Sequence, residues 1–107
     1  MTTKRFIKDL RALVLKFRED SIAMCGGPKY AAFSDTVVWD EAKSDSLGHG
    51  KCVALVFDGG GYDELSCQGM LADLGSESYR VKVFALAKRH GMHAEDYTSY
   101  MMTFHAE

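Results

Sequence analysis

The apolar residues near the start of the chain recur at the spacing of an amphipathic helix. They follow the i, i+3, i+4, i+7 pattern of one helical face, and they are Phe6, Ile7, Leu10, Leu13, Val14 and Phe17. Lysines and arginines fill the opposite face. The pattern predicts a helix that runs to about Met24, because Gly26-Gly27-Pro28 is a strong stop signal.

Two short segments in the middle of the chain have the composition of β-strands. Residues 36–39 are rich in β-branched and aromatic side chains. The five apolar residues 53–57 predict a strand that is buried on both faces and extends from about Lys51 to Asp58. Glycine, serine and aspartate in residues 43–50 predict a loop. We therefore expect a hairpin with a long connection.

The last third of the chain predicts a helix and a strand. Residues 62–75 fit helical spacing only weakly, whereas residues 77–90 predict a helix with basic residues at its end and Gly91 just beyond. Residues 97–105 predict a terminal strand with Tyr100, Met102 and Phe104 on one face. Because Met101 makes the other face apolar too, this strand is either central or covered by a partner, which favours a homodimer or a protein complex.

The order of these elements predicts a single α+β domain that spans residues 1–107. We expect a small, mostly antiparallel sheet of three to four strands covered by two main helices, in the order α-β-β-(weak element)-α-β. The composition is 47% hydrophobic and 26% charged, which is close to the average for globular domains.

Cysteine usage and the N-terminal sequence predict a cytoplasmic protein. The three cysteines form no Cys-x-x-Cys pair, and an odd number of unpaired thiols fits a reducing compartment. The charged N-terminus does not resemble a signal peptide. No apolar run approaches the roughly 18 residues that a membrane span needs, so we expect no membrane interaction.

Charge is distributed unevenly along the chain. Residues 1–29 hold seven basic and three acidic side chains, a net charge of +4, whereas residues 30–75 hold two basic and eight acidic ones, a net charge of −6. The remainder is neutral, which gives −2 overall. The basic helix and the acidic middle either pair with each other in the fold or present two charged surfaces to partners.

The segment from Asp58 to Glu64 places carboxylates on both sides of three glycines at the end of the interior strand. Asp58, Asp63 and Glu64 could bind Mg²⁺ or Ca²⁺ through oxygen ligands, as in a small metal-dependent hydrolase or nucleotide-handling enzyme. However, their spacing does not match an EF-hand, and no Gly-Lys-Ser/Thr follows the glycines to form a phosphate loop. We therefore predict no metal site.

Other catalytic chemistry has weaker support in the sequence. The four histidines lack metal-ligand spacing, and a pairing of Cys67 with His90 depends on tertiary folding alone. The sequence therefore favours a protein that is not an enzyme and needs no cofactor. Nucleic-acid binding is the other alternative, but an acidic middle and a negative net charge disfavour it. It would use the basic face of the first helix, with Lys4, Arg5, Lys8, Arg11, Lys16 and Arg18.

The leading hypothesis is a non-catalytic binding protein that docks on a protein with a basic surface, through an acidic and aromatic patch. In size and lack of motifs the chain resembles the small accessory proteins of bacteriophages and mobile elements, some of which are inhibitors, although this likeness covers no specific residue. The predicted partner-binding residues are Trp39, Asp40, Glu41, Asp45, Asp58, Tyr62, Asp63 and Glu64.

Overall fold

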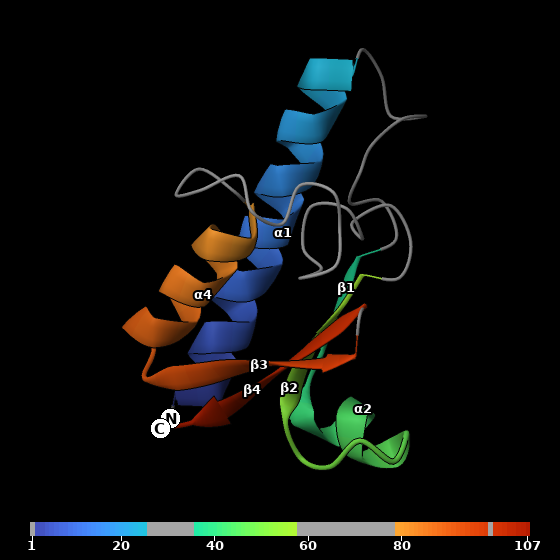
Figure 1. Ribbon diagram of the computed structural model, residues 1–107, viewed down its shortest axis with the longest axis vertical. Helices are drawn as coiled ribbons and strands as arrows, with labels where there is room; N and C mark the ends of the chain where they lie inside the picture. The colour runs from blue at the N-terminus through green and yellow to red at the C-terminus, as the bar shows by residue number, and fades with distance from the viewer. Residues whose placement is uncertain (1, 26–35, 58–78, 99) are drawn as a thin grey trace.

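The computed structural model describes residues 2–25, 36–57, 79–98 and 100–107. In this part of the chain there are three helices and four strands (Figure 1). The elements in chain order are α1 (Thr2–Cys25), β1 (Val37–Trp39), α2 (Glu41–Ser46), β2 (Val53–Val56), α4 (Tyr79–Arg89), β3 (Met92–Thr98) and β4 (Met101–Ala106).

The strands form one antiparallel sheet in the order β1-β2-β4-β3. β1 pairs with β2 so that Val38 lies opposite Leu55, and β2 pairs with β4 so that Leu55 lies opposite Met102. The hairpin of β3 and β4 contains an irregularity between Asp96 and Thr98. The predicted α+β class, with a mostly antiparallel sheet and two main helices, is confirmed.

The main core lies between one face of the sheet and the pair α1 and α4, which lie side by side (Figure 1). Phe6 is fully buried and meets the edge of the Phe104 ring at a centroid distance of 5.0 Å. The ring centroids of Phe17 and Tyr79 are 4.6 Å apart, and this contact joins α1 to α4. The apolar stripe of α1 therefore holds this helix on the sheet, as its spacing predicts.

The second face of the sheet carries a smaller cluster, made by Ala54, Val56 and Met101 with Trp39 against it. Trp39 stacks on His49 at a ring distance of 5.9 Å, and His49 meets the edge of Tyr97 at 5.3 Å. All four residues of β2 are buried, which confirms the prediction of a strand buried on both faces.

The prediction of a loop over residues 43–50 is wrong at its start. Residues 41–46 form α2, because Asp40 caps the helix: the Lys43 backbone N–H donates to Asp40 Oδ1 at 2.8 Å. Glu41 places a negative charge in the first turn, where it interacts favourably with the helix dipole. Aspartate and serine are common in loops and also at helix starts, so composition alone does not separate the two.

The terminal strand predicted over residues 97–105 is confirmed over residues 101–105 and is wrong at its start. Residues 92–106 form the β3–β4 hairpin, and Tyr100 lies in its turn rather than on a strand face with Met102 and Phe104. The latter two residues do share the helix-covered face. β4 lies between β2 and β3, which agrees with the central position predicted as one explanation of its two apolar faces.

The helix limits agree closely with prediction where they can be compared. α1 ends at Cys25, one residue beyond the predicted end. α4 ends at Arg89, and Gly91 follows with a φ of 69°, a left-handed conformation that favours glycine. Residues 58–78, which include the acidic turn, the weak element and the predicted start of the second helix, lie outside the described residues.

Candidate functional site

The two main helices form a strongly basic layer. Together α1 and α4 hold ten lysines and arginines against three acidic residues, a net charge of +7. In the other described segments, residues 36–57, 90–98 and 100–107, two lysines stand against six acidic residues, a net charge of −4. Folding therefore adds the cations of α4 to those of α1, on the opposite side of the core from the second sheet face.

Few of these cations are neutralised by the carboxylates whose positions are described. Arg80 of α4 pairs with Asp96 of β3 through both terminal guanidinium nitrogens, and Nη1 lies 2.7 Å from Asp96 Oδ1. Among the described residues, no ion pair within 4.0 Å involves any lysine or arginine of α1. Hence the basic face of α1 is not paired with the described acidic residues.

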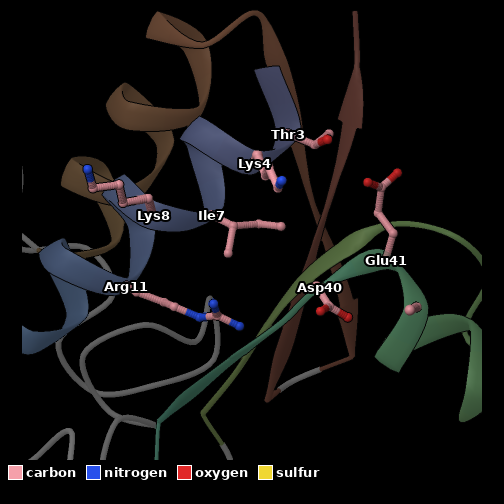
Figure 2. A pocket seen from close by; sticks show the side chains of 8 residues that line it. Thr3, Lys4, Ile7, Lys8, Arg11, Asp40 and Glu41 are labelled. Atoms are coloured by element: carbon pink, nitrogen blue, oxygen red, sulfur yellow. The ribbon is translucent and has the colours of Figure 1, made fainter. Parts of the chain in front are cut away.

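A groove of about 620 Å³ separates the first half of α1 from the start of α2 (Figure 2). Lys4, Lys8 and Arg11 belong to its α1 side, and Asp40 and Glu41 belong to its α2 side. In Figure 2, Arg11 extends from α1 toward the side of α2, whereas Lys8 points away from it. The described residues that line the groove are Thr3, Lys4, Ile7, Lys8, Arg11, Asp40, Glu41 and Ala42.

The positions of these side chains follow from the two helices. Lys4, Ile7 and Arg11 are three and four residues apart, so they share one face of α1. Asp40 lies at the start of α2, where its side chain accepts a hydrogen bond from the Lys43 backbone N–H. Glu41 follows in the first turn. The walls of the groove therefore carry opposite charges, and no described ion pair crosses it. Ile7 and Ala42 add apolar surface between them.

The structure describes four of the eight predicted partner-binding residues. Asp40 and Glu41 line the groove, and Asp45 is exposed on α2. Trp39 instead packs on the second sheet face, because alternate residues of a strand point to opposite faces. The other predicted residues, Asp58, Tyr62, Asp63 and Glu64, lie outside the described part of the chain.

Cys52, the cysteine whose side chain is described, is poorly suited to nucleophilic chemistry. Cys52 is buried, and its thiol donates to the backbone carbonyl of His49 at 3.6 Å. Burial raises the pKa of this thiol, and the negative charge of Glu41 raises it further. The reactive thiolate is therefore disfavoured at this position.

The histidines of the β3–β4 hairpin gather around one carboxylate. His93 Nε2 lies 3.3 Å and His105 Nε2 lies 3.9 Å from opposite oxygens of Glu95. Across the described residues, however, no group of three or more His, Cys, Asp or Glu side chains has the geometry to hold a metal ion. Asp58, Asp63 and Glu64, the predicted metal-binding alternative, lie outside the described residues.

Comparison with known proteins finds no similar family, curated protein or solved structure. The class of the protein is therefore defined by the structure alone, as a four-stranded antiparallel α+β domain with a basic helical layer. Within the described residues, no helix has the length and apolarity required to cross a bilayer.

Sequence reasoning identified the charged residues of the groove but assigned them to two separate hypotheses. From sequence alone, Lys4 and Arg11 belong to the nucleic-acid-binding alternative, and Asp40 and Glu41 belong to the patch for a basic protein partner. The sequence does not indicate that Ile7 lies between these charges in the same groove. The signal for Ile7 was present, because it lies at the edge of the apolar stripe of α1 and is only partly buried.

Proposed function

We propose that this protein is a non-catalytic binding protein that docks an acidic segment of a partner protein in the groove between α1 and α2. The observation that carries the proposal is the α1 wall, where Lys4 and Arg11 flank Ile7 and have no described ion-pair partner. An acidic peptide would supply carboxylates for the two cations and apolar contact for Ile7.

The opposite wall favours a protein over a nucleic acid. Asp40 and Glu41 would repel a phosphate backbone that entered the groove, but they can pair with a basic side chain of a polypeptide. A partner segment with acidic residues toward α1 and a basic residue toward α2 matches both walls. Charge of opposite sign on the two walls would also fix the direction in which the segment lies.

The exposed part of α1 beyond the groove extends the surface that a partner can contact. A groove of about 620 Å³ holds a few residues of a peptide, since ligand pockets cover about 300–1,000 Å³. Beyond the groove, α1 continues for several turns and exposes 55% of Leu15 among its cations. An apolar residue surrounded by lysines and arginines is suited to the edge of a protein interface.

The test compares proteins captured from a native lysate on the immobilised wild-type chain and on two charge-reversed variants. Lys4→Glu/Arg11→Glu reverses the α1 wall of the groove. Lys16→Glu/Arg18→Glu reverses the same number of charges on the same helix, at positions that do not line the groove. We expect a captured partner to be lost on the first variant and retained on the second, and its affinity for the wild type to fall as salt rises.

Two results would contradict the proposal. Equal loss on both variants would indicate general attraction to the basic helix rather than docking in the groove. Capture that disappears after nuclease treatment would identify a nucleic acid as the ligand. Circular dichroism of each variant confirms that the fold is intact.

A second surface is suited to a basic partner protein, which is the kind of partner that the sequence favours. Tyr97 is 51% exposed beside the stacked pair of Trp39 and His49, and Asp45 is exposed on α2. Exposed aromatic surface with an acidic neighbour is suited to a basic protein. A partner that is retained by Lys4→Glu/Arg11→Glu but lost by Asp45→Lys would select this surface.

A further inference from the structure

A second hollow, of about 570 Å³, lies where the start of α1 meets the end of α4. It is lined by Arg5 and Asp9 from α1 and by Arg89 and His90 from the end of α4. Arg5 and Asp9 are four residues apart and so share a helix face. This hollow shares no lining residue with the groove toward α2, and the proposed docking function does not use it.

His90 is held firmly at the base of this hollow. Its Nε2 donates to Asp9 Oδ2 at 2.9 Å, and its ring packs against Phe6 at a centroid distance of 5.5 Å. Only 12% of the His90 side chain is exposed. The bond to Asp9 fixes the orientation of the imidazole, and it also engages the one carboxylate among the described residues that line the hollow.

The two arginines give the hollow an excess of positive charge. Arg5 and Arg89 are exposed, and neither forms an ion pair with a described carboxylate. Against the single carboxylate of Asp9, these two arginines give the described lining an excess of one positive charge. The N-terminal pole of α1 and the C-terminal pole of α4 lie next to each other, so their dipoles largely cancel and the side chains set the local field.

We propose that this hollow binds a phosphate monoester group. A guanidinium group presents several N–H donors in a fixed plane and can bind a phosphate through two of them. Two arginines can thus contact different oxygens of one tetrahedral dianion in the hollow that His90 also lines. A carboxylate offers one negative charge and two oxygens in a plane, so it satisfies this donor set less well.

The phosphate can be part of a small molecule or can be carried on a protein, and the chemistry at the hollow is the same. The test therefore uses three probes in NMR titrations: inorganic phosphate, a short glycine-flanked phosphoserine peptide, and the same peptide with serine. Acetate at equal ionic strength controls for salt. We expect saturable shifts of the His90 ring signals with phosphate and with the phosphoserine peptide, but not with serine peptide or acetate.

Paired variants locate the binding. Arg5→Gln/Arg89→Gln removes both guanidinium groups, and we expect it to weaken phosphate binding at least about tenfold, since charge-assisted hydrogen bonds are lost. Lys16→Gln/Arg18→Gln removes two charges elsewhere on α1 and should retain wild-type affinity within about twofold, because exposed charges that are not in contact contribute little. All four substituted residues are exposed, so neither double substitution should unfold the protein.

The outcomes separate the sources and the alternatives. Tighter binding of the phosphoserine peptide than of inorganic phosphate indicates a phosphate carried on a protein, and the reverse indicates a small phosphate ester. The proposal is overturned if acetate produces the same shifts, if phosphate fails to saturate, or if Arg5→Gln/Arg89→Gln binds as the wild type does. None of these results bears on docking in the groove toward α2, because Lys4 and Arg11 are unchanged in every variant.

Discussion

The two walls of the groove are helices that are stabilised in different ways. α1 has 24 residues and buries an apolar stripe under the sheet, yet it has no acidic residue in its first turn and no basic residue in its last. α2 has six residues, and it begins with a capping aspartate and an acidic first turn. The long helix departs from the local electrostatic preferences that the short helix follows.

The contrast shows which helix is free to carry functional charge. A helix of six residues is too short to be stable by itself, so α2 depends on Asp40 and Glu41. α1 is held by tertiary packing of Phe6, Leu10 and Phe17. Its exposed face therefore does not need charges that favour the helix dipole. Cations that oppose the helix dipole are thus tolerated on α1, and residues that break local rules are often found at functional sites.

The largest expected effect is the loss of an aromatic contact that holds α1 on the sheet. Phe6→Ala removes a fully buried ring that packs against Phe104 and His90, and we expect it to lower the free energy of unfolding by about 3–5 kcal/mol. Urea denaturation measures this change. Leu15→Ala on the same helix is the control, since Leu15 is exposed. Equal effects of the two substitutions would show that the buried stripe does not fix α1.

An intermediate effect is expected at the start of the short helix. Asp40→Ala removes the acceptor for the Lys43 N–H, which should lower the free energy of unfolding by about 0.5–2 kcal/mol. Asp40→Asn retains an oxygen acceptor and should recover most of that loss. Thermal denaturation of the three proteins gives the comparison. If asparagine were no better than alanine, the charge of Asp40 rather than its capping hydrogen bond would stabilise α2.

The same contrast explains how much of the fold the sequence predicts. α1 is long and periodic, so its limits follow from apolar spacing and a glycine-proline stop. α2 depends on one side-chain hydrogen bond from Asp40, and the residues that make such a bond are also typical of loops. β3 is an edge strand whose side chains are mostly exposed, so Met92–Thr98 lacks the apolar alternation that identifies a buried strand.

The candidate site was predictable only in part, because it depends on contacts between distant segments. The charge of Lys4 and Arg11 and that of Asp40 and Glu41 are evident in the sequence. Nothing in their spacing places residue 40 across a groove from residue 4, since that position depends on how α1 and β1 pack in the fold. The hollow that joins Arg5 to Arg89 likewise requires α1 and α4 to lie side by side.

The smallest effect is the most informative about the role of the α1 cations. Lys4 lies in the first turn of α1, where its charge opposes the helix dipole. Lys4→Glu should therefore raise the free energy of unfolding by about 0.3–1 kcal/mol, with an added contribution from attraction to Lys8 four residues later. Lys4→Gln should give a smaller gain, and the gain of both variants should shrink in high salt.

Lys4→Glu and Lys4→Gln should weaken binding of an acidic partner even though they stabilise the fold. Lys4→Glu replaces a cation of the groove wall with a negative charge, so a protein that is more stable should bind an acidic partner less well. Such a result would show that the lysine is retained for recognition at a cost in stability, as is common at functional sites. Urea denaturation and partner titration on the same samples test both halves. A loss of stability in Lys4→Glu would instead mean that Lys4 makes a stabilising contact in the native fold, and the α1 wall would then be structural.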